Sequence, residues 1–301
     1  MAEFLPLELD RLPLVRECLA ENPPEISEHT FTNLYIWRKS RSIEMIDSGR
    51  AILFLARREG HASIFGPPVG GMEPAEAAAA ASGAAGGAPI PFERLTKSYA
   101  EAVIVAGGEI LEDRANFDYV YRRSDLAELA GRRYHAKRNL ISQCLAENEL
   151  SYEEIEPANL DELSGMMDEW CRRRGCNHDT GLCDEYIAVK ELFANYAKLG
   201  AIGAAIRIEG KIAAFTVGEK LNDSTAVIHF EKAMPEYKGL YQVMNNWFAK
   251  NHLGKFEFVN REQDLGMDGL RRAKESYFPS HMVEKYSMPL PATTKLNRCT
   301  E

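Results

Sequence analysis

The sequence contains no apolar run that approaches the roughly 18–20 residues needed to span a membrane. Its first residues, MAEFLPLELDRLP, are acidic and lack the basic segment and apolar core of a secretory signal. We therefore expect a cytoplasmic protein without integral membrane contact. The six cysteines are unevenly spaced, which favours free thiols over a disulfide framework in that compartment.

The sequence also has fewer basic than acidic residues. Acidic residues outnumber Lys and Arg by 45 to 36, which gives a net charge of −9. A protein that binds duplex DNA normally carries a clear basic excess, so this partner is not expected. A local basic segment can still meet a phosphate group or the end of a nucleic acid.

Several motifs of known chemistry are missing. The sequence has no G-x-S-x-G nucleophile elbow, and its Ala/Gly-rich stretch near 70–88 lacks the Gly-Lys-Ser/Thr of a P-loop. Cys171, Cys176, His178 and Cys183 form C-x4-C-x-H-x4-C, which misses the usual zinc spacing. We expect no metal site and no resident cofactor, and we interpret residues 70–88 as a flexible surface insertion.

Two stretches of the chain resemble each other. Residues 117–126 align without a gap on residues 256–265, and the hairpin at Glu59-Gly60 aligns on that at Glu209-Gly210. Such self-similarity indicates a duplicated unit, for which 301 residues leave enough room. The predicted organisation is a first copy at 1–123 that carries the insertion, a connecting helix at 124–150, a second copy at 151–290 and a tail at 291–301.

Periodicity and turn residues predict helices and strands in both copies. In the first copy, helices within 8–40 precede strands at 42–46, 51–56 and 61–65, a helix at 92–106 and a strand at 118–121. A long helix is predicted at 125–147. In the second copy, helices within 159–200 precede a three-stranded meander, a helix at 240–252 and strands at 256–259 and 282–286. The pattern indicates a mixed α/β (α+β) fold.

This order is that of the GCN5-related N-acetyltransferases, and some segments are more specific. They are residues 33–37 (NLYIW), 118–121 (DYVY) with 129–139 (LAGRRYHAKRN), 229–233 (HFEKA), and 259–266 (VNREQDLG) with 269–274 (GLRRAK). Together they resemble the family of bacterial proteins similar to the C-terminal domain of phosphatidylglycerol lysyltransferases. The resemblance extends from about residue 31 to residue 286. It implies a tandem repeat of two acetyltransferase-like (acyl-CoA N-acyltransferase-like) domains.

The resemblance also implies aminoacyl transfer. Better-known relatives move an aminoacyl group from aminoacyl-tRNA to a lipid hydroxyl or, in the peptidoglycan-bridge enzymes, to an amine. This sequence differs from the lysyltransferases because it shows no membrane-spanning part, which argues against a lipid acceptor. It differs from acetyl-CoA enzymes because their Q/R-x-x-G-x-G/A loop is replaced by residues 236–241 (EYKGLY), with one glycine.

Acyl transfer passes through a tetrahedral oxyanion, which needs hydrogen-bond donors or a cation, and often a base for the nucleophile. We predict that Glu231, Asn260 and Asp264 are catalytic, with Glu231 or Asp264 as the base and Asn260 orienting the substrate. Further residues are candidates for binding the donor or substrate: His229, Lys232, Gly239, Tyr241, Arg261, Glu262 and Lys274. The alternative for Glu231, Lys232, Arg261 and Asp264 is a structural salt-bridge network.

The densest basic segment lies within the predicted helix at 125–147. Its Arg132, Lys137, Arg138 and Asn139 are candidates for binding an anion, a phosphate or the acceptor end of tRNA. The alternative is a solvated helix face.

The sequence predicts a transferase that moves an acyl or aminoacyl group from aminoacyl-tRNA or acyl-CoA to a small-molecule hydroxyl or amine. The active cleft is expected in the second copy, with the first copy completing its wall. No activated nucleophile is evident, so we expect direct transfer rather than a covalent acyl-enzyme. Two alternatives remain open: acetyl-CoA-dependent N-acetylation, and a non-catalytic module that binds a ligand.

Overall fold

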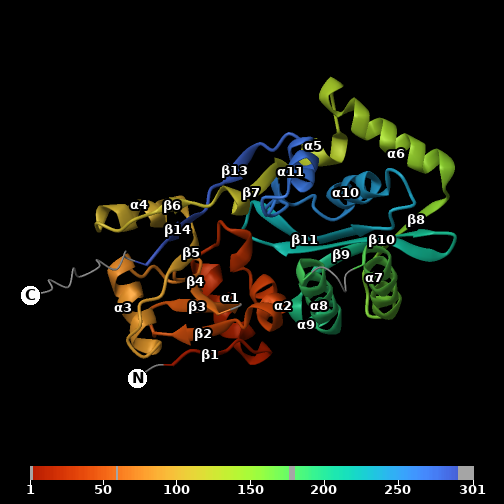
Figure 1. Ribbon diagram of the computed structural model, residues 1–301. Helices are drawn as coiled ribbons and strands as arrows, with labels where there is room; N and C mark the ends of the chain where they lie inside the picture. Colours follow the sequence, from red (N-terminus) through yellow and green to blue (C-terminus); the bar gives the residue numbers. More distant parts are fainter. Residues whose placement is uncertain (1–2, 59, 176–179, 291–301) are drawn as a thin grey trace, which may run out of the picture.

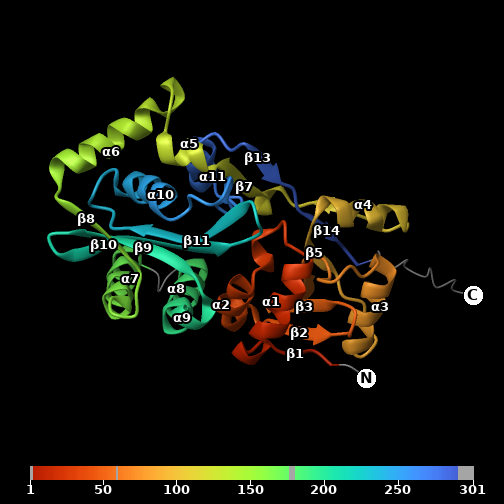
Figure 2. The same cartoon turned by 180° about the vertical axis from the view of Figure 1, so that it is seen from behind.

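The computed structural model describes residues 3–58, 60–175 and 180–290. It contains two seven-stranded sheets, one in each half of the molecule, with helices packed against them (Figures 1 and 2). Within the described ranges, no helix is both long and apolar enough to cross a membrane.

The first copy begins with a short edge strand and two helices. Its elements are β1 (Leu5–Pro6), η1 (Leu9–Arg11), α1 (Leu12–Glu21), η2 (Ser27–His29), α2 (Phe31–Arg41), β2 (Glu44–Asp47), β3 (Ile52–Arg58), β4 (His61–Phe65), α3 (Pro74–Ala84), β5 (Phe92–Leu95), α4 (Lys97–Val105), β6 (Leu111–Glu112), η3 (Arg114–Asn116) and β7 (Asp118–Arg122). Helix α1 ends just before Asn22-Pro23-Pro24. Thr30 caps α2, because its hydroxyl accepts a hydrogen bond from the backbone N–H of Asn33.

The second copy follows after a linking segment. That segment contains α5 (Arg123–Glu128), η4 (Arg132–Tyr134) and α6 (His135–Glu147). The second copy contains β8 (Leu150–Glu154), α7 (Leu160–Arg174), α8 (Thr180–Ala194), α9 (Tyr196–Leu199), β9 (Ile202–Ile208), β10 (Lys211–Lys220), β11 (Thr225–Ala233), α10 (Leu240–Asn251), β12 (Phe258–Asn260), α11 (Asp268–Glu275), β13 (His281–Val283) and β14 (Tyr286–Met288).

The two sheets have equivalent strand orders. The first is β1-β2-β3-β4-β5-β14-β6, and the second is β8-β9-β10-β11-β12-β7-β13. In both, the fourth and fifth strands are parallel. The sixth place is exchanged, because β14 from the end of the chain completes the first sheet and β7 completes the second (Figure 1). The predicted duplication is therefore confirmed, and each copy supplies one strand to the other.

The duplication was predicted from pairs of similar segments, but the two segments of each pair occupy different places in their sheets. By position in the sheets, β12 corresponds to β5, whereas residues 117–126 contain β7, which lies next to β12 and pairs with it antiparallel. The β3–β4 hairpin likewise corresponds to β10–β11 rather than β9–β10. The assignment of β7 to the first copy's own sheet was wrong, although the duplication holds.

One apolar core spans both copies. Helix α2 of the first copy packs against α8 of the second. Trp37 in α2 meets Phe230 in β11 with ring centroids 6.2 Å apart, and Phe31 and Leu34 lie in the same buried cluster as Phe215. Shared burial of this extent favours a fixed arrangement of the two copies.

Three local expectations differ from the structure. The Ala/Gly-rich stretch contains helix α3, with Ala77 and Ala81 fully buried, because small side chains let the helix pack closely. The long helix at 125–147 is interrupted between α5 and α6, where Leu129 and Gly131 have positive φ angles. Among the cysteines that the structure describes, Cys171 is disulfide-bonded, and Cys18, Cys144 and Cys183 are free thiols.

Two further expectations concern residues outside the described ranges. The tail at 291–301 is one, and the positions of Cys176 and His178 in the cysteine-histidine segment are the other.

Candidate functional site

The side chain of Lys285 joins the two exchanged strands. Lys285 precedes β14 and is fully buried, with its Nζ 2.6 Å from Oδ1 of Asp118, the first residue of β7. The same Nζ lies 2.5 Å from Oε2 of Glu28. Burial would raise the pKa of Glu28, but the charges of Lys285 and Arg94 outweigh burial and lower that pKa. The strand exchange therefore places a buried ammonium and two buried carboxylates in contact at the boundary between the two copies.

Asn260 connects this cluster to β12. Its Nδ2 donates to Oδ2 of Asp118 at 2.9 Å, and its Oδ1 accepts from the backbone N–H of Glu262 at 2.8 Å. The second bond supports the left-handed backbone of Glu262, whose φ is 56°. Asn33 of α2 donates to Glu262 Oε1 at 3.1 Å. Asn260, predicted to orient the substrate, thus fixes the path of the loop after β12.

His229 lies at a β-bulge, between two carboxylates. The register of β10 against β11 shifts between Val217 and Gly218, which leaves His229 as the extra residue. Its Nδ1 is 2.8 Å from Glu262 and its Nε2 is 2.8 Å from Glu219. Burial would lower the pKa of His229, but the two carboxylates outweigh burial and raise it to about 9. The ring is therefore an imidazolium at neutral pH.

Glu231 and Arg261 meet between β11 and the loop after β12. Arg261 Nη2 donates to Glu231 Oε1 at 2.9 Å, and Asn245 of α10 donates to Oε2 at 3.1 Å. Lys274 donates to the carbonyl oxygens of Arg261 and Glu262, the latter at 3.3 Å. Burial, followed by the charge of Arg261, lowers the pKa of Lys274 to about 8. These predicted site residues converge, and each one is bound by another member of the network.

Asp264 and Lys232 belong to separate ion pairs. Asp264 is fully buried and accepts from Arg271 at 2.8 Å, from Arg114 at 3.1 Å and from the Tyr119 hydroxyl at 2.7 Å. Burial would raise the pKa of Asp264, but Arg271 and Tyr119 outweigh burial and hold it well below its usual range. Lys232 pairs with a carboxylate of α8 at 2.6 Å. These contacts are those expected of a structural salt-bridge network, which was the alternative to a catalytic site. A catalytic role for Asp264 stays a prediction.

Gly239 immediately precedes α10, at the place where the phosphate of a donor was expected. Its φ is 89°, and a Cβ at this position would lie 2.2 Å from the carbonyl oxygen of Leu140 in α6. The start of α10 is therefore in close contact with α6. Tyr241, in the first turn of α10, is partly buried, and this burial raises its pKa.

In the basic segment, Lys137 and Arg138 have hydrogen-bond partners within the chain, whereas Arg132 has none among the described residues. Lys137 donates to the Ser276 hydroxyl at 2.6 Å, and Arg138 donates to carbonyl oxygens of the turn between α5 and α6. Asn139 interacts with a histidine one turn earlier. Arg132 is exposed, and its side chain has no hydrogen-bond or ion-pair partner within the part of the chain that the structure describes.

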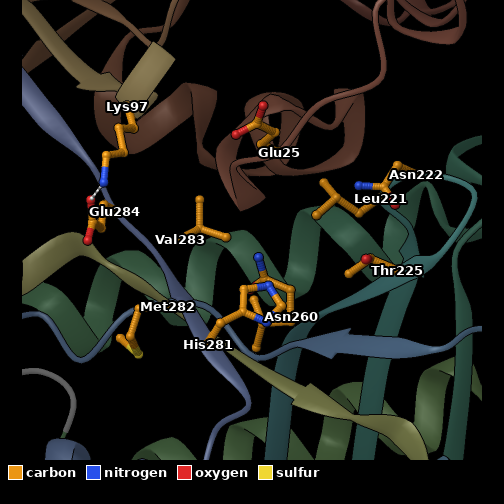
Figure 3. A pocket seen from close by; sticks show the side chains of 11 residues that line it. Glu25, Lys97, Leu221, Asn222, Thr225, Asn260, His281, Met282, Val283 and Glu284 are labelled. Atoms are coloured by element: carbon orange, nitrogen blue, oxygen red, sulfur yellow. Dashed lines mark ion pairs between the residues drawn. The ribbon is translucent and has the colours of Figure 1, made fainter. Parts of the chain in front are cut away.

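A cavity of about 390 Å³ lies between the two copies (Figure 3). We call it the seam cavity. Glu25 and Lys97 of the first copy line one side, and Asn260, Thr225 and His281 of the second copy line the other. A volume of this size suits a small molecule. Asn260 is the one predicted site residue among the residues that line it.

His281 in β13 offers the seam cavity an imidazole. Its ring packs edge-on against Phe258, with centroids 5.4 Å apart, and its Nδ1 lies 2.8 Å from the Ser280 hydroxyl. Partial burial and the charge of Arg122 lower the pKa of His281 from its ordinary value of 6.5. The ring is therefore neutral at pH 7, in contrast to His229, and can accept a proton.

Sequence reasoning missed His281, Glu25 and Lys97. They lie in β13, in the loop before η2 and at the start of α4, three segments far apart in the chain. The exchange of strands brings these segments together. No local motif marks any of the three, so no sequence signal could have grouped them.

Comparisons with known proteins agree with this architecture. The family model "Phosphatidylglycerol lysyltransferase, C-terminal" matches residues 20–288. A conserved protein of unknown function from Bacteroides thetaiotaomicron VPI-5482 is 28% identical, with a TM-score of 0.88 over 95% of this chain and 99% of that one. No curated protein matches the sequence.

Two more distant structures bear on the fold alone. L-PGS from Bacillus licheniformis is 14% identical, with a TM-score of 0.63 over 92% of this chain and 91% of that one. A tandem GNAT protein from the clavulanic acid biosynthesis pathway is 12% identical, with a TM-score of 0.50 over 95% of this chain and 98% of that one. The predicted fold, a tandem of acetyltransferase-like domains, is confirmed.

Proposed function

Because the chain belongs to the family of phosphatidylglycerol lysyltransferase C-terminal domains, we propose that it transfers an aminoacyl or acyl group. The donor is an activated ester or thioester, and the acceptor is a small molecule with a hydroxyl or an amine. The proposal is supported above all by the seam cavity, where both copies surround the neutral His281 and the amide of Asn260.

His281 is the proposed general base. When Nδ1 keeps its proton for the Ser280 hydroxyl, Nε2 carries the lone pair and takes the proton from the acceptor. The acceptor oxygen or nitrogen then bonds to the carbonyl carbon of the donor, and the C–O or C–S bond of the donor breaks. The group leaves as an alkoxide or a thiolate and takes the proton from the His281 imidazolium, which returns His281 to its neutral form.

Two side chains are candidates for stabilising the oxyanion of this reaction. The amide nitrogen of Asn260 has a second N–H besides the one donated to Asp118. Lys97, which pairs with Glu284 at 3.2 Å, places a cation at the other side of the cavity (Figure 3). Donors aimed at the place where charge develops contribute strongly to acyl-transfer rates.

The packing of Gly239 favours aminoacyl-tRNA over acetyl-CoA as the donor. A phosphate group at the start of α10 would compete for space with α6, since a Cβ at Gly239 would already lie 2.2 Å from Leu140 O. The exposed Arg132 is the candidate contact for the acceptor end of tRNA, because Lys137 and Arg138 are used in internal hydrogen bonds.

Transfer of label provides the test. Purified protein is incubated with labelled aminoacyl-tRNA or labelled acetyl-CoA and a panel of small alcohols and amines, and the labelled products are measured. His281→Gln should lower the transfer rate by about 10²–10⁴-fold, the usual contribution of a general base. His61→Gln is the matched control, because His61 is an exposed histidine paired with Glu93 and does not line the seam cavity.

The alternatives give different results. Consumption of acetyl-CoA without use of aminoacyl-tRNA would support N-acetylation. Binding of a donor without any transfer would support the non-catalytic module. Full activity of His281→Gln would remove His281 as the base.

A further inference from the structure

The first copy contains a second cavity, also of about 390 Å³, between the ends of β4 and β5. We call it the N-copy cavity. Its walls are the loop after β4, the loop before η2 and the start of α4, and most of the side chains that line it are apolar. Those apolar residues include Leu19, Pro23, Pro24, Ile26, Pro67, Pro68, Val69, Met72 and Pro74.

The loop after β4 forms a fixed wall of this cavity. The backbone N–H and carbonyl oxygen of Val69 exchange hydrogen bonds with Ile52 of β3, at 2.9 and 2.8 Å. Gly66 lies so close to His29 that a Cβ there would be 1.9 Å from its ring. Together with the prolines, these contacts make the cavity preorganised, which lowers the entropic cost of binding.

The charge on the N-copy cavity is negative. Glu25 and Glu73 line it, and no lysine or arginine does. Within the described ranges, neither carboxylate has a hydrogen-bond or ion-pair partner for its side chain. His29 adds no positive charge, because burial lowers its pKa and its Nε2 is bonded to the carbonyl oxygen of Phe65.

Tyr99 supplies a polar group without a partner. Its hydroxyl is buried and has no hydrogen-bond partner among the described residues, and its side chain lines the cavity. Burial and the charge of Glu73 raise its pKa, so the hydroxyl keeps its proton. An unsatisfied buried hydroxyl costs free energy that a bound polar group can recover.

We propose that the N-copy cavity binds a compact apolar amine in its ammonium form, with the apolar body among the prolines and the ammonium at Glu25 and Glu73. An anionic or phosphate-bearing ligand is excluded because it would face two carboxylates without a compensating cation. This site is separate from the proposed transfer reaction. Glu25 lines both cavities, so a ligand in the N-copy cavity would lie next to the seam cavity.

Three probes of similar shape test the proposal by calorimetry on the full chain. They are phenethylamine (a cation), 2-phenylethanol (neutral) and 3-phenylpropanoate (an anion). We expect phenethylamine to bind most tightly and 3-phenylpropanoate at least 10-fold more weakly. The advantage of the amine over the alcohol should shrink as ionic strength rises, because salt screens charges that are exposed to solvent.

Variants assign the binding to this cavity. Glu25→Gln and Glu73→Gln should each weaken the binding of phenethylamine by about 2- to 5-fold, the size expected of an exposed charge pair. The affinity for 2-phenylethanol should stay unchanged. Glu21→Gln is the control, since Glu21 is exposed nearby and does not line the cavity. Ala102→Phe should fill the cavity and abolish binding of every probe.

Three results would overturn the proposal: equal binding of the cation and the anion, equal losses for amine and alcohol in the glutamine variants, or no binding of any probe at millimolar concentration. The measurement contains no transfer step. An inactive protein that binds the amine would therefore count only against the proposed function, and an active protein that does not bind it would count only against this site.

Discussion

The ammonium of Lys285 and the carboxylate of Asp118 lie 2.6 Å apart, fully buried, and each stands at the beginning of a strand that one copy gives to the other. Asp118 starts β7 in the second sheet, and Lys285 directly precedes β14 in the first. The pair therefore links both sheets at one point. Neither copy can complete its sheet without the other.

Replacing Lys285 should destabilise the whole protein. Lys285→Met leaves the buried carboxylates of Asp118 and Glu28 without their shared cation, and the expected loss is about 3–5 kcal/mol in the free energy of unfolding. Urea unfolding followed by circular dichroism measures it. Lys250→Met on the exposed side of α10 is the control and should change stability by less than about 0.5 kcal/mol. Equal stability of the two variants would contradict a role for Lys285 in joining the copies.

His229 should make stability depend on pH above neutrality. Its folded pKa of about 9 lies above the ordinary 6.5, so its contribution is fully present below pH 6.5 and is lost as pH rises through 9. We expect a loss of about 1–3 kcal/mol across this interval. Chemical unfolding at pH 6, 7, 8 and 9 measures it.

The control for this profile is His229→Gln, compared with the parent protein at each pH. Lys274 titrates in the same region with the opposite sign, because its pKa of about 8 lies below its ordinary 10.5 and deprotonation favours the folded state. Subtracting the two profiles removes this contribution. A difference that stays constant from pH 6 to 9 would show that His229 is not charged in the fold.

Local structure was well predicted from the sequence, but the partner of each strand was not. The turn at Glu209-Gly210 and the start of α10 after Gly239 lie where turn chemistry placed them. The exchange of β7 and β14 was missed because a strand of three to five residues carries the same alternation whichever sheet it joins. The partner of each strand is decided by buried contacts between residues far apart in the chain, such as that between Lys285 and Asp118.

The predicted site illustrates the same limit. Spacing after the predicted strands placed Glu231 near Arg261 and Asn260 near Glu262, and each pair is hydrogen-bonded, although β11 extends to Ala233 and therefore contains Glu231. It could not show that these groups are bound to one another. Nor could it find His281, whose place in the seam cavity depends on strand β7 from the other copy.

Asp264 should prove to be a structural residue. Asp264→Asn removes the charge that binds Arg271 and Arg114 and should lower the unfolding free energy by about 3 kcal/mol. Its folded pKa is lowered, so its contribution is present above the ordinary 3.8 and is lost as pH falls through the folded value. The loss should therefore be the same at pH 6 and 8.

Chemical unfolding of Asp264→Asn is compared with that of Asp223→Asn, which changes an exposed carboxylate paired with Lys220. Any transfer activity, measured per folded molecule, should survive in Asp264→Asn. A stable variant without activity would instead support the catalytic role predicted from the sequence.

Gly239 should tolerate no side chain. Gly239→Ala places a Cβ 2.2 Å from Leu140 O at a φ of 89°, so α6 and α10 must separate and the backbone is strained. We expect a loss of at least about 2 kcal/mol in unfolding free energy, because backbone atoms cannot move aside as a flexible side chain can. Gly254→Ala is the matched control, since it has an ordinary φ and nothing within 4 Å of the added Cβ. If both variants unfold at the same urea concentration, α6 does not pack tightly on α10, and the packing of Gly239 no longer disfavours acetyl-CoA as the donor.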